Sequence, residues 1–338
     1  MDEQGWAKIV AAATRAPSIH NTQPWRFVAS PDRLEVFLDP RRALPVLDPS
    51  TRQQVISCGV AVEFAVVALA AAEWDVEVAL EPDADDPDHL ATVQLTGRRE
   101  PTDRDRAFAE AIDRRHTVRA PFQARPIPGD LVDALQAEAG SSGTWVKPIT
   151  ESEEEVATVF LISRAEEAEQ SDPAYVAELQ RWLRTDPGAV DGVPIEAVPS
   201  EDPRGRPSNW MIRDFVVGTR QRQRFQPGGD PDAPPPPVER PAVMLMGTDN
   251  DDRYAWLLSG RALGRLLLHA TAEGLAASPL TQALDWPATR TTLRSRLSLI
   301  GHPQMLLRMG YPSTPDAGTP SGRRPVAEVL RYEPAGGA

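Results

Sequence analysis

The chain has 338 residues, of which 41% are hydrophobic and 25% are charged, as is typical of soluble globular proteins. Aspartate and glutamate outnumber lysine and arginine by 49 to 36, and the net charge of −13 argues against nucleic acid or an anionic membrane as a partner. Cys58 is the single cysteine, which argues against a disulfide or a thiolate metal cluster and favours the cytoplasm. The N-terminal sequence MDEQGWAKIV does not have the pattern of a signal peptide.

A polar segment, APSIHNTQPWRF (Ala16 to Phe27), follows an expected helix from Trp6 to Arg15. Pro17 should end that helix and Pro24 should hold the next turn rigid, because proline fixes φ and blocks helix formation. A rigid polar loop suits a ligand. Alternatively, Ser18 and Asn21 satisfy their own backbone at a helix exit, and the local sequence alone favours this second interpretation.

The next segment, Val55 to Ala72, is apolar and long enough to span a bilayer. Glu63 lies at its middle, and no basic cluster flanks it to set a topology. We therefore expect a helix buried within the protein.

Two segments of the chain align without a gap, Arg52 to Trp74 with Arg253 to Leu275. The identical pairs are Arg52 and Arg253, Gly59 and Gly260, Ala61 and Ala262, and Ala71 and Ala272. A strand-like run follows each segment and ends on a glycine. The pattern predicts two copies of one unit, residues 1–104 and 105–338, although so few identities also fit two unrelated helices rich in alanine and leucine.

The second copy contains an insertion at residues 183–240 that is rich in proline. Such a stretch is either a linker or a lid. If it is a lid, Trp210, Met211 and Phe215 are the expected apolar contacts.

Basic residues gather in two short segments. In RRHTVR, Arg115, Thr117 and Arg119 alternate, so an extended backbone would direct two guanidinium groups and a hydroxyl to one side, where they suit a phosphate. Arg323 and Arg324 could close on the same anion. Alternatively, the first group forms surface salt bridges and the second solvates a tail.

Several well-known sites are absent from the sequence. The histidines do not have metal-ligand spacing, and there is no Gly-x-Ser-x-Gly elbow, Walker loop or Gly-x-Gly-x-x-Gly fingerprint. A hydrolase, a metalloenzyme, a P-loop enzyme and a Rossmann dehydrogenase all lose support.

Three motifs together resemble the FMN-dependent nitroreductase family. RRHTVRAPFQARPIP is similar to its phosphate-binding segment, APSIHNTQPWRF to its flavin-edge loop, and GHPQMLLRMGYP with RRPVAEVL to its last strand and basic pair. Two fused copies with a proline-rich insertion resemble in particular the Acg-like, single-chain branch.

The resemblance implies an α+β fold in which the fused copies form a pseudo-dimer within one chain. In such a pseudo-dimer the helices that carry Gly59 and Gly260 would pack against each other as its core. It implies one FMN per chain at the junction of the copies, and a monomer as the default state. By position, Arg115, Thr117 and Arg119 would hold the phosphate and ribityl chain, and Arg324, alone or together with Arg323, would complete the phosphate site. The resemblance further places Pro17, Ser18 and Asn21 at the flavin ring, and backbone groups of Pro279, Thr281 and Gln282 near its N5 atom.

Two functions fit this resemblance. The first is an oxidoreductase in which NAD(P)H reduces the flavin and a nitroaromatic or quinone-type acceptor is then reduced. The second is a catalytically silent protein that stores FMN beneath the lid. No side chain is assigned as a catalytic acid or base, which flavin chemistry tolerates because the cofactor carries the reaction.

Overall fold

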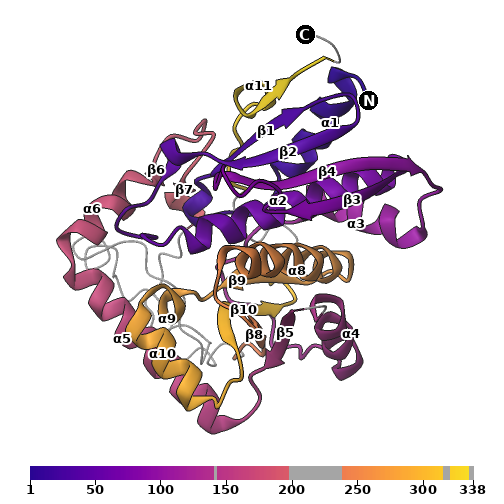
Figure 1. Cartoon of the computed structure of the whole chain (residues 1–338). Coiled ribbons are helices and arrows are strands. Elements are labelled where there is room, and N and C mark those ends of the chain that lie inside the picture. Colours follow the sequence, from indigo (N-terminus) through magenta and orange to yellow (C-terminus); the bar gives the residue numbers. More distant parts are fainter. Residues whose placement is uncertain (141–142, 198–237, 315–319, 335–338) are drawn as a thin grey trace.

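The computed structural model describes residues 1–140, 143–197, 238–314 and 320–334. Within this part of the chain, two sheets lie on either side of a pair of long helices, α2 (Arg52–Ala71) and α8 (Arg253–Ala272). Figure 1 shows the sheet of the first half above the pair and the sheet of the second half below it. The mixture of helices and sheets confirms the α+β class.

The first half begins with α1 (Glu3–Ala13), which Asp2 caps through its side chain. The helix ends two residues before the predicted limit because Thr14 and Arg15 already turn into the polar loop. The rest of this half comprises η1 (Ile19–Asn21), β1 (Trp25–Ala29), β2 (Arg33–Leu38), η2 (Pro40–Arg42), α2, β3 (Trp74–Leu80) and β4 (His89–Arg98). Its sheet has the order β11-β1-β2-β4-β3, in which β11 (Leu330–Tyr332) comes from the far end of the chain and runs parallel to β1.

The second half builds a sheet of order β5-β8-β10-β9 with antiparallel neighbours. Its strands are β5 (Thr144–Pro148), β8 (Ala242–Thr248), β9 (Ala276–Pro279) and β10 (His302–Gly310). Its other helices are α3 (Asp103–Arg114), α4 (Gly129–Ala139), α5 (Ser152–Ser171), α6 (Pro173–Arg181), α9 (Gln282–Asp285), α10 (Pro287–Arg296) and α11 (Val326–Val329).

Both sheets follow one strand order when their own strands are counted along each half: first, second, fourth, third. In both halves the long helix lies between the second strand and the third. This is the order expected if the halves repeat one unit. The repeat and the boundary between residues 104 and 105 stay predictions.

Two glycines set the approach of α2 and α8. A Cβ atom on Gly260 would lie 2.1 Å from the Ile56 carbonyl oxygen and 2.8 Å from the Cα of Gly59. Only glycine fits on either side, because the facing atoms belong to backbone that cannot rotate away. The predicted packing of the two glycine-bearing helices is confirmed.

Helix α2 is buried in protein, as predicted. It is long and apolar enough to cross a membrane by length and composition, but 83% of its most apolar window lies inside the fold. Glu63 is only 5% exposed and bonds Arg261 at 2.8 Å and Arg265 at 3.2 Å, both on α8. The charge that interrupts the apolar run is therefore neutralised by the facing helix.

The start of the predicted insertion is folded onto the first half. Strand β6 (Leu183–Arg184) pairs with β7 (Val193–Pro194), and η3 (Ile195–Ala197) follows. Val193 is 1% exposed and packs in a cluster with Leu44, Leu47 and residues of α6. Val193, with the half-buried Leu183, thus anchors the start of the insertion on the first half, and the choice between a linker and a lid for the whole insertion stays a prediction. Trp210, Met211 and Phe215 lie outside the described residues.

Candidate functional site

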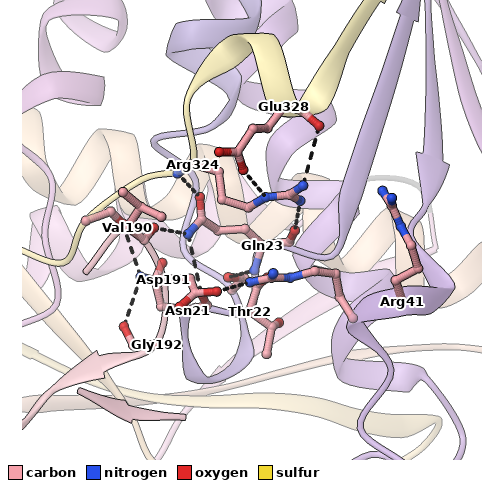
Figure 2. A network of polar contacts seen from close by, with 12 residues as sticks. Asn21, Thr22, Gln23, Arg41, Val190, Asp191, Gly192, Arg324 and Glu328 are labelled. Atoms are coloured by element: carbon pink, nitrogen blue, oxygen red, sulfur yellow. Dashed lines mark hydrogen bonds and ion pairs between the residues drawn. The ribbon is translucent and has the colours of Figure 1, made fainter. Parts of the chain in front are cut away.

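The polar loop predicted to meet a ligand adopts a constrained backbone. His20, Asn21 and Gln23 have φ values of 45°, 54° and 51°, in the left-handed region that side chains disfavour. The Gln23 side chain holds this shape: its amide donates to the Val190 carbonyl at 2.8 Å and its oxygen accepts from the Arg324 backbone N–H at 2.9 Å. Figure 2 shows Gln23 between these two segments, which lie far apart in the sequence.

Asn21 is held in the same network. Its amide nitrogen donates to the carbonyls of Gly192 and Gly322 at 3.0 and 3.1 Å, and its oxygen accepts from Arg323 at 3.2 Å. The Asn21 amide therefore bonds protein on both sides. In this arrangement it shapes the loop and orients Arg323, whereas the family resemblance assigned it to the flavin ring.

Two adjoining compartments of one cavity lie between the halves; the compartment that reaches α2 and α8 is called inner, and the one beside Arg15 and Arg323 is called outer. Pro17, Ser18, Arg115, Thr117 and Arg119 line both compartments. The inner compartment adds an apolar wall from α2, α8 and β10, namely Ile56, Val60, Leu263, Leu267, Met305 and Leu307. The outer compartment adds Arg15, Asn21, Asp113, His116, Ser321 and Arg323. The cavity thus has an apolar end and a basic end, which suits a flat ring that carries an anionic tail.

The segment that carries Arg115, Thr117 and Arg119 crosses the edge of the second sheet. Thr117 forms a parallel bridge with Ala277 of β9, and the Val118 N–H donates to the Ala277 carbonyl at 3.2 Å. Val118 is fully buried, so its two neighbours face the opposite way, into the cavity. The alternation read from RRHTVR is therefore present in the structure.

Two arginines at the basic end bond only carbonyl and amide oxygens within the described residues. Arg115 and Arg323 both donate to the Arg15 carbonyl, at 3.3 and 3.1 Å, just beyond the C-terminal end of α1. Burial, with the nearby charge of Arg15, lowers the pKa of Arg115 to about 9 and that of Arg323 to about 10, and Arg323 contributes to the shift of Arg115. Both Nε–H groups are buried without an acceptor in this part of the chain. The site is short of negative charge, which a bound anion would supply.

Arg324 is directed elsewhere. It is 8% exposed, lies outside both compartments, and has ion-pair partners in Asp39 at 3.8 Å and Glu328 at 3.7 Å. Figure 2 shows its side chain between Gln23 and Glu328. The structure therefore brings Arg323, and not Arg324, to the group of Arg115 and Arg119.

The polar wall on the other side of the inner compartment is organised by Asp285. Its carboxylate accepts from the Gln53 amide at 2.8 Å and from the Thr281 hydroxyl at 2.8 Å, and both of these residues line the compartment. Arg52 donates to Asp285 at 3.2 Å and is itself buried. This wall joins α2 of the first half to α9 of the second and neutralises its own charges.

The residues assigned to the flavin N5 region lie at this wall. Pro279 and Thr281 line the inner compartment. Gln282 is fully buried behind them, and both polar atoms of its side chain lack a hydrogen-bond partner among the described residues. The structure thus places two of the three at the cavity surface.

Sequence reasoning missed most of the apolar wall and His20. Ile56 and Val60 flank Gly59, and Leu263 and Leu267 follow Gly260, each pair at helical spacing. That spacing beside the close-approach glycines could have identified them. His20, in the polar loop, lines the inner compartment, but the direction of its side chain depends on a left-handed backbone conformation that the sequence does not predict.

No protein-family model matches the chain. It is 35% identical over 326 residues to a protein of Mycobacterium tuberculosis named "Putative NAD(P)H nitroreductase Rv3131", covering 96% of this chain and 90% of that protein. It is 31% identical over 325 residues to "Putative NAD(P)H nitroreductase acg" of the same bacterium, covering 95% and 93%. Among solved structures, a nitroreductase with bound FMN from Desulfitobacterium hafniense has 14% identity and a TM-score of 0.41, over 67% of this chain and 98% of that one. On the strength of the two relatives that it matches almost end to end, the chain belongs to the Acg-like nitroreductase family.

Proposed function

We propose that this protein binds one FMN in the two-compartment cavity and uses it to pass electrons from NAD(P)H to a nitroaromatic or quinone-type acceptor. The observation that carries the proposal is the pairing of a basic end, where Arg115 and Arg323 bond no carboxylate in the described chain, with an apolar wall between α2 and α8. The relatives carry NAD(P)H nitroreductase in their names, which supports the same chemistry.

The residues present fit FMN. The unpartnered Nε–H groups of Arg115 and Arg323 offer donors to a phosphate, and Thr117 and Arg119 line the same compartment. Guanidinium groups bind phosphate through paired, charge-assisted hydrogen bonds, which are stronger where solvent is excluded. When bound, FMN would supply hydride chemistry that amino-acid side chains lack.

The apolar compartment would receive the ring. Ile56, Val60, Leu263 and Leu267 offer a flat aliphatic wall, and the Asp285 wall fixes Gln53 and Thr281 beside it. These residues would orient the ring and exclude water from one face. His20 lies in the same compartment, where a donor or acceptor of an entering substrate would meet it.

One cavity at the junction of the two halves supports one FMN per chain. In this proposal the halves are a fused pseudo-dimer, each supplying what the other lacks: the loop at Pro17 to Asn21 from the first, and the basic segment from the second. Such a chain completes its site without a partner subunit. We therefore propose a monomer that acts in the cytoplasm on small molecules.

Anaerobic reduction tests the function. The protein is saturated with FMN and mixed with NADH or NADPH under argon, and the loss of flavin colour is followed before and after a quinone is added. We expect one nicotinamide to bleach the flavin and the quinone to restore the colour. A flavin that only dithionite reduces would favour the storage function. A protein that binds no FMN would overturn both.

A further inference from the structure

A fully buried ion pair lies beneath the basic segment, outside the cavity. Arg308 of β10 and Glu239 both have side chains that are 0% exposed, and one Arg308 nitrogen lies 2.8 Å from each carboxylate oxygen of Glu239. Neither residue lines the cavity compartments. Desolvating two charges is costly, so the pair needs further partners to persist in a core.

Those partners are backbone groups of the basic segment. The other Arg308 nitrogen donates to the carbonyls of Arg119 and Ala120 at 3.0 and 2.8 Å. Glu239 accepts from the Phe122 N–H at 2.6 Å, and the Arg308 guanidinium lies 4.7 Å from the centre of the Phe122 ring. Together the two side chains bond three of the four residues from Arg119 to Phe122, all except Pro121.

The position of these bonds along the segment is informative. A bridge from Thr117 to Ala277 holds one side, and a bridge from Phe122 to Pro312 holds the other. Between the two bridges the chain leaves the edge of the sheet, and in this stretch Arg308 donates hydrogen bonds to the carbonyls of Arg119 and Ala120. The direction in which the Arg119 side chain leaves this stretch depends on the peptide groups that Arg308 fixes.

We propose that Arg308 and Glu239 are positioning residues, which hold the backbone of residues 119–122 so that Arg119 faces the anion in the cavity. The inference rests on the proposed function, because the anion is the phosphate of FMN. It also explains why β10 carries a buried arginine where its neighbours Leu306 and Leu307 are apolar. Neither residue touches the cofactor in this arrangement.

An apolar replacement of the whole pair separates positioning from stability. The double variant Arg308→Met with Glu239→Leu removes both charges together, and such exchanges often preserve the stability of a fold. We expect it to fold, because no buried charge is left without its partner, but with a lower urea midpoint, because the Phe122 N–H and the Arg119 and Ala120 carbonyls lose their partners. It should bind FMN about 10- to 100-fold more weakly, as expected when charge-assisted contacts are lost. At saturating FMN its kcat should stay near the wild-type value, because the ring compartment is unchanged.

Two further variants complete the test. Arg308→Lys keeps the charge beside Glu239 but loses the planar fork that reaches both carbonyls, so its FMN affinity should fall between the wild type and the double variant. Asp105→Ala is the matched control: it removes the capping box and the Arg99 ion pair at the far end of α3, which should lower the urea midpoint and leave FMN affinity unchanged.

The outcomes are distinct. FMN affinity equal to the wild type in the double variant would overturn the positioning role and leave the proposed function intact. If the double variant does not fold, Arg308→Lys decides, and an unchanged Kd in that variant would overturn the role. A fall in affinity that Asp105→Ala reproduces in proportion to its lost stability would also overturn it. Wild-type protein that binds no FMN would remove the proposed function and the inference together.

Discussion

The arginines in the two polar regions of the cavity have different hydrogen-bond partners. At the basic end, Arg115 and Arg323 bond carbonyls and the Asn21 amide oxygen, with no carboxylate partner in the described residues. At the opposite wall, Arg52 bonds Asp285 and the carbonyls of Leu284 and Gln304. One region keeps its positive charge uncompensated, and the other neutralises it within the protein.

This difference distinguishes a region that is suited to bind a ligand from a region that has a structural role. Carbonyls orient a guanidinium group without cancelling its charge, so the basic end is prepared for an anion and is strained without one. The wall around Asp285 needs nothing from outside and joins the two halves of the chain. An arginine near a cavity is therefore informative only once its partners are known.

The comparison breaks if the basic end does not bind the anion. Replacing Arg115 and Arg323 with alanine together should weaken FMN binding by roughly 100- to 10,000-fold, since each charged hydrogen-bonding group contributes about 1.5–3 kcal/mol. Equilibrium titration of apoprotein with FMN measures the effect. Because the Arg15 carbonyl and the Asn21 amide oxygen also lose donors, urea denaturation of both apoproteins is measured beside the titration to separate lost affinity from lost stability.

The matched control is Arg114→Ala, which changes the charge of the adjacent, exposed residue. It should leave FMN binding nearly unchanged, because an exposed charge is screened by solvent. A double variant that still purifies with a full complement of flavin would remove the basic end from the cofactor site.

The two regions keep their spacing only if α2 and α8 stay in contact. Gly260→Ala would place a methyl group 2.1 Å from the Ile56 carbonyl oxygen and 2.8 Å from the Cα of Gly59, both in the backbone of α2. We expect a loss of roughly 3 kcal/mol in the free energy of unfolding, at the upper end for an overpacked core. Urea denaturation checks this value. Gly97→Ala, where an added methyl would meet nothing within 4 Å, should cost far less, and equal losses would contradict the close contact.

The sequence was informative wherever the deciding contacts are local or periodic. Alternation in RRHTVR located Arg115, Thr117 and Arg119 on one side, and the aligned glycines located the contact of α2 with α8. A two-residue period and a close-approach glycine are readable without knowing the fold.

Contacts between distant segments were not readable. Arg323 and Arg324 are adjacent, yet the first turns to the basic end and the second to Asp39 and Glu328. The directions of these two side chains depend on where β11 pairs with β1, and the C-terminal sequence has no pattern that predicts this parallel strand. The same holds for Gln23, whose amide is satisfied by a carbonyl from the segment assigned to a linker or lid.

Asp48 offers a test of how charge is neutralised at the wall around Asp285. Its carboxylate lies just before α2 and accepts from the backbone N–H groups of Gln53 and Gln54. Burial, opposed by those bonds and by Arg52, raises the pKa of Asp48 to about 6. The folded protein therefore holds this proton more tightly than the unfolded chain. The stabilisation is complete below about pH 4 and is lost as the pH rises through about 6.

Asp48→Asn should remove this dependence, because asparagine stays neutral and can still accept a bond at the helix start. As the pH rises from 4.5 to 6.5, the free energy of unfolding of the variant should increase by roughly 2 kcal/mol relative to that of the wild type, since each pKa unit is worth about 1.4 kcal/mol. Urea denaturation of both proteins at the two pH values isolates the difference from the other titrating groups. Parallel curves for the two proteins would mean that Asp48 is charged at both pH values in the folded protein. The charges of this wall would then be less completely neutralised than the geometry indicates, and the contrast with the basic end would be smaller.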